Sequence, residues 1–182
     1  MSKVIATQRL LLRRWREEDR APFAEMNADP RVMEFLPAPL DRTTSDALID
    51  RIENDFDQFG YGLWAVELST TGKFIGFTGL TLQTFDAAFT PAVEVGWRLA
   101  RHAWGHGYAT EAAQAAVKFG FDQVGLREIV SMTTVANTRS RNVMRRLGMT
   151  HDPAEDFEHP RLPTGHPLRQ HVLFRLSKAF KE

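Results

Sequence analysis

The chain has 182 residues, of which 43% are hydrophobic and 25% charged, values typical of one globular domain with its own core. Its 23 Lys and Arg residues balance 23 Asp and Glu residues, so charge gives no reason to expect a nucleic-acid or membrane partner. No cysteine is present, which excludes disulfides, a catalytic thiol and cysteine-ligated metal.

The distribution of apolar residues favours a cytoplasmic enzyme or binding protein. Residues Met1–Arg9 lack the apolar core of a signal peptide, and no apolar run approaches the ~18 residues of a membrane span. We expect a single domain over residues 1–182, because only Asp152–Pro167 resembles a boundary and the piece after it is too short to fold alone.

Strands and helices are both predicted in the first half of the chain. The turn signal Thr71-Gly72 joins two of the strands into a hairpin. In chain order, the expected elements are a strand at Gln8–Arg13, helices at Arg16–Met26 and Thr44–Gln58, and strands at Leu63–Leu68, Phe74–Gln83 and Pro91–Leu99.

In the second half, helices alternate with strands. The expected elements are a helix at Tyr108–Gln123, a strand at Glu128–Val135, a short helix at Thr138–Leu147 and a last strand at Arg169–Leu176. Between the last two, Asp152–Pro167 holds four prolines and is predicted to be a long loop, either a surface connection or a lid over an acceptor. Early hairpins followed by alternating elements predict an α/β (α+β) domain with a mixed, mostly antiparallel sheet.

The most informative segment is the loop before the third predicted helix. Gly105 and Gly107 precede a helix whose apolar residues recur in steps of three and four. A helix start exposes unpaired N–H groups, and glycines let the backbone approach a ligand, so the loop predicts a pyrophosphate site. The alternative is a plain strand–helix turn. The dinucleotide motif would need a glycine at Thr110, and the Walker pattern is absent.

The stretch Trp104-Gly-His-Gly-Tyr-Ala-Thr-Glu-Ala112 resembles the acetyl-CoA motif of the GCN5-related N-acetyltransferases (GNAT), most of all the ribosomal-protein N-terminal acetyltransferase (RimJ/RimL-like) branch. In the family pattern Gln/Arg-x-x-Gly-x-Gly/Ala, both glycines match, and the first position departs because it falls on His102. The resemblance continues at Arg9–Arg13, Phe74–Gly76, Glu94–Trp97 and Asn137–Met149.

This resemblance implies acetyl-CoA as cosubstrate, bound where the sheet of the family splays. The pantetheine arm would lie along main-chain groups of Trp97, Arg98 and Leu99 and would bond to Asn137, which could instead be a helix cap. The residues implied to bind the rest of the cofactor are His102, Trp104, Gly105, His106, Gly107, Tyr108, Ala109 and Thr110.

Two residues are candidates for catalysis. Ser140 lies on the inward face of its predicted helix, and the resemblance implies that it helps the CoA thiolate depart, because Met144 stands where many members have a tyrosine. Tyr108 is the alternative acid, and Ser140 could instead be a small packing residue. Glu94 would be the base, directly or through water, unless it is a solvated strand glutamate. Gly96, two residues later, suggests a bulge or a closely approaching ligand.

The function implied is direct transfer of acetyl from acetyl-CoA to a primary amine, either a peptide N-terminus or a small-molecule amine, with a backbone N–H near Trp97 stabilising the oxyanion. A non-catalytic module that senses acyl-CoA is the alternative. We expect no metal, because glycines interrupt the pair His102 and His106 and no His-Glu-x-x-His occurs. The sequence leaves monomer and homodimer open.

Overall fold

One sheet of nine strands organises residues 4–178, the part of the chain that this computed structural model describes. The predicted domain, residues 1–182, also includes 1–3 and 179–182, which lie outside the described residues. The strands are β1 (Ile5–Ala6), β2 (Leu10–Arg13), β3 (Leu63–Leu68), β4 (Phe74–Gln83), β5 (Ala92–Leu99), β6 (Glu128–Thr134), β7 (Thr150–His151), β8 (Phe157–Glu158) and β9 (Gln170–Ser177). Their order is β1-β2-β3-β4-β5-β6-β9-β7, with β8 also paired to β9.

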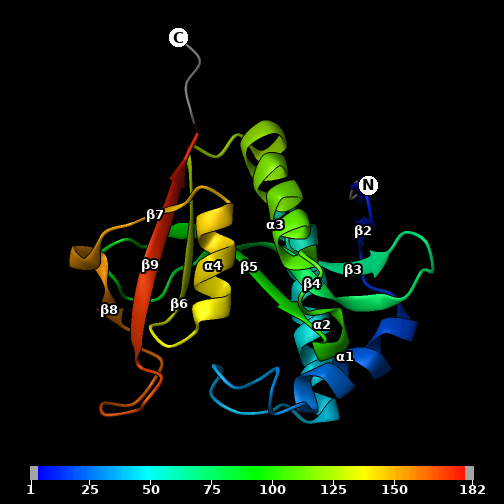
Figure 1. Cartoon of the computed structure of the whole chain (residues 1–182), viewed down its shortest axis with the longest axis horizontal. Helices are drawn as coiled ribbons and strands as arrows, with labels where there is room; N and C mark the ends of the chain where they lie inside the picture. Colours follow the sequence, from blue (N-terminus) through cyan, green and yellow to red (C-terminus); the bar gives the residue numbers. More distant parts are fainter. Residues whose placement is uncertain (1–3, 179–182) are drawn as a thin grey trace.

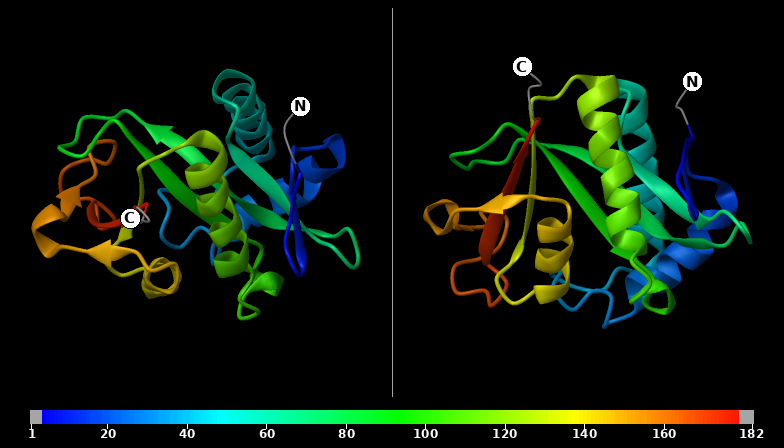
Figure 2. Two further views of the ribbon diagram at one scale, coloured as in Figure 1. Left: turned by 90° about the horizontal axis from the view of Figure 1, so that it is seen from above. Right: turned by 45° about the horizontal axis from the view of Figure 1, so that its top comes forward.

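All the strand pairs are antiparallel except β5 with β6, so the predicted mixed, mostly antiparallel sheet is confirmed. The α-helices of the described residues are α1 (Arg20–Ala28), α2 (Arg42–Phe59), α3 (Tyr108–Phe119) and α4 (Thr138–Arg146). Figures 1 and 2 show α3 and α4 on one side of the sheet and α1 with α2 on the other. None of the described helices is long and apolar enough to cross a membrane.

Side-chain contacts assign the two faces of the central strands. On one face, the ring of Phe77 in β4 lies 6.0 Å from that of Phe23 in α1. On the other, Gly120, which continues α3 as a π-helical turn, approaches Leu80 so closely that a Cβ would lie 3.0 Å from its Cδ1. Because side chains alternate along a strand, the faces of the paired β5 residues follow. Arg98, opposite Phe77, faces α1, whereas Val95, opposite Leu80, faces α3.

Local signals explain where the longer helices begin and end. The Asp41 carboxylate accepts a bond of 2.7 Å from the Thr44 N–H and caps α2, which ends at Gly60 in the left-handed conformation (φ 75°). The helix predicted at Tyr108–Gln123 is α-helical to Phe119 and then widens into the π turn Gly120–Val124. A side chain on Gly120 would clash with residues of the sheet, so the close packing of this turn requires glycine.

Two sequence predictions need correction, one of them the bulge that was one of two alternatives at Gly96, and one strand was not predicted. The predicted loop Asp152–Pro167 contains a 3-10 turn at Pro153–Glu155 and strand β8, which pairs with β9. Strand β1 was not anticipated, since two-residue edge strands are too short to show a periodicity. The register of β4 and β5 runs unbroken through Gly96, so the predicted bulge there is wrong; a bulge occurs instead between Val66 and Glu67 of β3.

The parallel strands β5 and β6 pair over only a short stretch of the described sheet. Their only register pair in the described residues is Glu94 with Val130, and beyond it the two strands diverge, as Figure 2 (right) shows. Ser131 of β6 bridges the start of the opening by donating a hydrogen bond of 2.9 Å to the Val95 carbonyl. The sheet is therefore splayed at this point.

A buried ion network fixes the entry into α1. Arg13 donates to Asp19 (2.6 Å) and to Glu67 (2.5 Å), and all three residues are at most 5% exposed. The pKa of Arg13 is raised: burial opposes this, but the hydrogen bonds that Arg13 donates to both carboxylates, and their negative charges, outweigh it. A buried cation with two buried anions is thus fully compensated.

Asp19→Ala would leave Arg13 with one carboxylate partner, Glu67, inside the protein. We expect the free energy of unfolding to fall by about 3–5 kcal/mol, measured by urea denaturation. The control is Glu17→Ala, which removes an 84%-exposed partner of Arg20 and should cost less than about 1 kcal/mol. Equal losses in the two variants would show that the buried network does not stabilise the fold.

Candidate functional site

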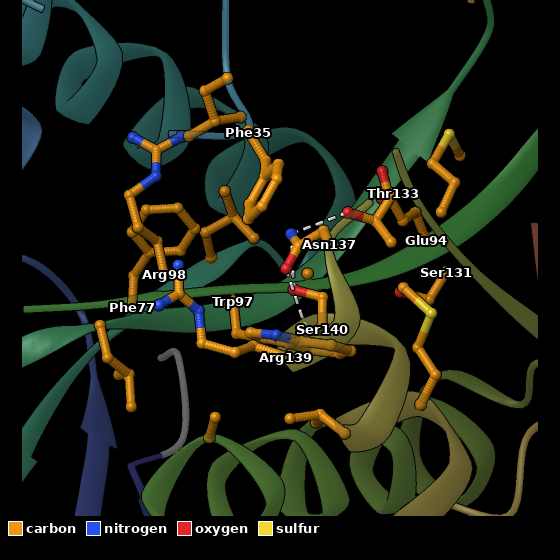
Figure 3. Close-up of a pocket in the computed structure, with 18 of the residues that line it drawn as sticks. Phe35, Phe77, Glu94, Trp97, Arg98, Ser131, Thr133, Asn137, Arg139 and Ser140 are labelled. Carbon is orange, nitrogen blue, oxygen red and sulfur yellow. Dashed lines mark hydrogen bonds between the residues drawn. The ribbon is translucent and has the colours of Figure 1, made fainter. Parts of the chain in front are cut away.

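A cavity of about 910 Å³ occupies the opening between β5 and β6, a volume within the usual range of ligand sites. Its walls come from β4, β5, β6, the start of α3, the inward face of α4 and the segment between α1 and α2. Figure 3 shows side chains from these elements converging on one space, among them Glu94, Trp97, Arg98, Asn137 and Ser140. The structure thus brings together residues 94–99, 104–110 and 137–140.

The loop before α3 has the backbone shape of an anion site. Gly105 and Gly107 both have φ of 79°, a conformation that other residues adopt only with strain, and Gly107 is the N-cap of α3. The first helical bond runs from the Glu111 N–H to the Gly107 carbonyl. The N–H groups of residues 108–110 therefore have no partner within the helix and add to its positive end. A Cβ on Gly105 would meet nothing within 4 Å, so the loop is open.

An ion pair between distant residues holds this loop. Arg9 bonds to Glu111 through Nε (2.7 Å) and to the His106 carbonyl through Nη1 (3.0 Å), and Thr7 adds a bond of 2.6 Å to Glu111. The pKa of Glu111 is lowered, because burial, which raises it, is outweighed by the hydrogen bonds that Thr7 and Arg9 donate to the carboxylate. The sequence could not reveal this pair, because its partners lie about one hundred positions apart.

The edge of β5 offers main-chain groups to the cavity. Ala100 N–H donates to Ile75 of β4, so alternation directs the peptide groups of Trp97 and Leu99 toward the opening. The Trp104 indole already donates to the Leu99 carbonyl (2.9 Å). The carbonyl of Arg98 faces β4, since a Cβ on Gly76 would lie 2.2 Å from it. Arg98 therefore contributes its side chain, not its main chain, to the cavity.

Asn137 and Ser140 form a small network at the start of α4. Asn137 caps the helix by accepting from the Ser140 N–H (3.2 Å), and its amide donates to Ser140 Oγ (3.2 Å) and Thr133 Oγ1 (2.9 Å). Since Ser140 Oγ accepts from Asn137, its own O–H remains available as a donor. Asn137 is thus a helix cap, and it also orients the serine.

Glu94 is not a solvated strand residue. It lies in the cavity on the α1 face of β5, and burial raises the pKa of its carboxyl to about 7. Hydrogen bonds from Gln83 (2.7 Å) and from the Met132 backbone oppose the increase without cancelling it. A carboxyl group with this pKa exchanges a proton readily at neutral pH. Gly96 beside it would find no atom within 4 Å of a Cβ, so space for a ligand is open there.

The remaining predicted residues divide into two groups. Trp104, Tyr108, Ala109 and Thr110 line the cavity, and Arg139 of α4 stacks on the Trp104 ring at 4.2 Å. His102 and His106 are exposed and do not belong to the lining; His106 stacks on Tyr108 with ring centroids 5.3 Å apart. Within residues 4–178, no three His, Asp or Glu side chains are placed to hold a metal ion together.

Arg161, in the segment predicted to be a loop or lid, also reaches the cavity lining. This segment is tied to the sheet by β8 and by ring contacts of Phe157 with Phe85 and Phe89 (6.2 and 5.0 Å between centroids). It therefore forms a wall of the cavity near Glu94, whose pKa Arg161 lowers slightly by its charge. Whether it moves as a lid remains a hypothesis from the sequence.

A protein-family model assigns this chain to one family. The model of the acetyltransferase (GNAT) domain matches residues 9–150. The protein YkkB of Bacillus subtilis, which is uncharacterized, is 29% identical over 80% of this chain and 84% of its own length. FsC-acetyl coenzyme A-N(2)-transacetylase of Aspergillus fumigatus is 34% identical, but over 50% of this chain and 40% of its own length.

Solved structures share the fold along nearly the whole chain. An acetyltransferase from Agrobacterium tumefaciens is 27% identical with a TM-score of 0.78, over 97% of this chain and 95% of that one. The ribosomal L7/L12 alpha-N-protein acetyltransferase RimL, solved in complex with coenzyme A, is 15% identical with a TM-score of 0.76, over 96% of this chain and 98% of RimL. At that identity, the likeness to RimL concerns the fold alone.

Replacing the donor to Glu94 tests the electrostatics of the cavity. In Gln83→Leu, the carboxylate loses a hydrogen bond that stabilises its charged form, so the pKa of Glu94 should rise above about 7. Carboxyl-carbon NMR titration measures it. The control Gln114→Leu changes an exposed residue of α3 and should leave the Glu94 titration unchanged. A fall in the Glu94 pKa in Gln83→Leu would contradict the assigned hydrogen bond.

Proposed function

This chain belongs to the GNAT acetyltransferases, and from that premise we propose that it transfers the acetyl group of acetyl-CoA to a primary amine by direct attack. The observation that carries the proposal is the splayed sheet: an anion-binding loop, an open strand edge and a carboxyl group with a pKa near 7 border one cavity. A binding module that only senses acyl-CoA would need the loop and the edge, but not this carboxyl group.

The residues on the α3 side fit acetyl-CoA. The free N–H groups at residues 108–110, with Gly105 and Gly107, suit its diphosphate, and the edge of β5 at Trp97 suits the amide groups of its pantetheine arm. When bound, the cosubstrate supplies an acetyl group activated as a thioester. The Trp97 N–H is proposed to donate to the carbonyl oxygen of that group, where negative charge develops.

Glu94 is proposed as the base. An amine must lose a proton before it can attack, and at pH 7 about half of the Glu94 side chains are deprotonated if the pKa is about 7. The carboxylate takes the proton, directly or through water, while Gln83 and the Met132 amide hold the group in place. Binding both substrates in one cavity contributes further to the rate.

Ser140 is proposed to donate its O–H to the departing thiolate sulfur. Its Oγ already accepts from Asn137, which leaves the hydroxyl hydrogen as the group's remaining donor. The known members leave the acceptor open between two classes. RimL acts on the α-amino group of a protein according to its name, whereas the fungal relative is named for FsC and a position N(2), so a peptide N-terminus and a small-molecule amine both stay within the proposal.

Gly107→Trp tests the phosphate loop. A side chain at this position is strained by the φ of 79° and fills the mouth of the loop, so the Kd for acetyl-CoA measured by calorimetry should rise about 100-fold or more. Gly125→Trp is the matched control, since Gly125 has a φ of 80°, open space around it and no place in the cavity lining. Unchanged affinity in Gly107→Trp would refute the assignment of the loop.

Glu94→Gln tests the base. In the unmodified chain, turnover should rise with pH and level off above about 7, because the deprotonated carboxyl is the active form and its pKa is raised to about 7. In the variant, this limb should vanish and turnover should drop about 100-fold, with little change in acetyl-CoA affinity. Glu25→Gln, an exposed change on α1, serves as control. Full activity of Glu94→Gln at every pH would remove Glu94 from the mechanism.

A further inference from the structure

Arg98 is a half-buried cation in the lining of the cavity, and it lacks a carboxylate partner among the described residues. Its Nη1 donates to Asn27 Oδ1 (2.7 Å), and its guanidinium carbon lies 5.2 Å from the centre of the Phe77 ring. Burial alone lowers the pKa of Arg98 to about 10, with no anion to raise it. Of the two carboxyl groups in the cavity, Asp55 interacts with Arg51 and Glu94 is bonded to Gln83.

Arg13 shows how this fold treats a buried arginine that is only structural. There, two buried carboxylates compensate one guanidinium, whereas Arg98 has a neutral amide in place of an anion. A guanidinium has five N–H donors, and in residues 4–178 Arg98 uses one of them in a hydrogen bond. Leaving a charge partly desolvated and uncompensated is costly, so an anionic ligand in the cavity would be stabilised by the donors that Arg98 has left.

The CoA diphosphate is not the partner of this site. Arg98 lies on the α1 face of β5, opposite Phe77. The loop at Gly105–Gly107 precedes α3, which covers the other face. Glu94 lies on the same face as Arg98, because it is four residues earlier in the strand. An anion bound to Arg98 would therefore lie on the same side of the cavity as the amine that the proposed base deprotonates.

We propose that Arg98 binds a carboxylate of the acceptor and so selects amines that carry a carboxylate at a distance from the amino group. The inference rests on the proposed function and names its substrate class. Four residues of strand span about 13 Å, and Arg98 bonds toward Asn27 of α1 while Glu94 bonds toward Gln83. The amine and the carboxylate of a free α-amino acid are too close together to meet both groups. Polyamines and aminoglycosides, which are cationic throughout, are disfavoured.

A small ω-amino acid and a peptide with an acidic residue near its N-terminus both carry a carboxylate at a distance from a primary amine. The small-molecule arm of the test compares 5-aminopentanoate with 5-aminopentanamide. The peptide arm compares Ala-Ala-Asp-amide with Ala-Ala-Asn-amide. In each pair, only the carboxylate is lost. Acetyl transfer by the full chain is followed through free thiol release, in the unmodified protein and in Arg98→Gln, Arg98→Lys and the exposed control Arg127→Gln.

We expect the acid to exceed its amide in kcat/KM by roughly 10- to 100-fold in at least one arm, the effect of hydrogen bonds to a charged group. The arm that shows it identifies the source of the carboxylate. Arg98→Gln should abolish the preference by raising KM for the acid, so that acid and amide are acetylated with equal kcat/KM. Arg98→Lys should retain part of the preference, and Arg127→Gln all of it.

Equal kcat/KM for acid and amide in both arms would overturn the inference, as would a preference that survives in Arg98→Gln. A second readout does not need turnover: NMR titration with the N-acetylated forms of the four acceptors. If no amine is acetylated but the acetylated acids bind better than their amides, and only with Arg98 present, then the proposed function fails and the Arg98 site stands. If neither binds better, the Arg98 site is overturned.

Discussion

The single register pair between β5 and β6 is the constraint on which the site depends. Past Glu94 and Val130 the two parallel strands separate, yet the peptide groups along the opening still need partners. Side chains supply some of these: Ser131 bonds to the Val95 carbonyl, and the Trp104 indole bonds to that of Leu99. These bonds satisfy part of the open edge of β5, and the main chain of Trp97 between them remains for a ligand.

The opening also joins two faces of the sheet that are chemically different. The α3 face carries the helix start with its unpaired N–H groups, and the α1 face carries Glu94 and Arg98. A cosubstrate bound on one face and an acceptor bound on the other can meet only through the gap between the strands. The splay thus lets cosubstrate and acceptor bind on different faces of the sheet while it places their reacting groups in one cavity.

Each part of the site is held by hydrogen bonds to neighbouring residues. Arg9 and Thr7 fix Glu111 and the loop beside it, Asn137 orients Ser140, and Gln83 fixes Glu94. The supporting groups come from three different regions of the chain, so the site forms only when the sheet is complete. Such hydrogen bonds limit the motion of the groups that act on a ligand, and catalysis requires that these groups be held in position.

The sequence by itself determined the features that depend on local periodicity and backbone conformation. The bounds of β3 and β4, the start of α3 and the glycines with φ of 79° all follow from residues adjacent in the chain. The motif around Gly105 and Gly107 also indicated the family, which the family model confirms over residues 9–150.

Only the tertiary structure decided which charges are compensated. Arg13 and Arg98 look alike in the sequence, but one meets two carboxylates and the other an amide. The raised pKa of Glu94 likewise arises from burial, and the Arg9–Glu111 pair joins positions about one hundred residues apart. Desolvation and long-range pairing depend on how the chain packs in three dimensions, and periodicity carries no information on them.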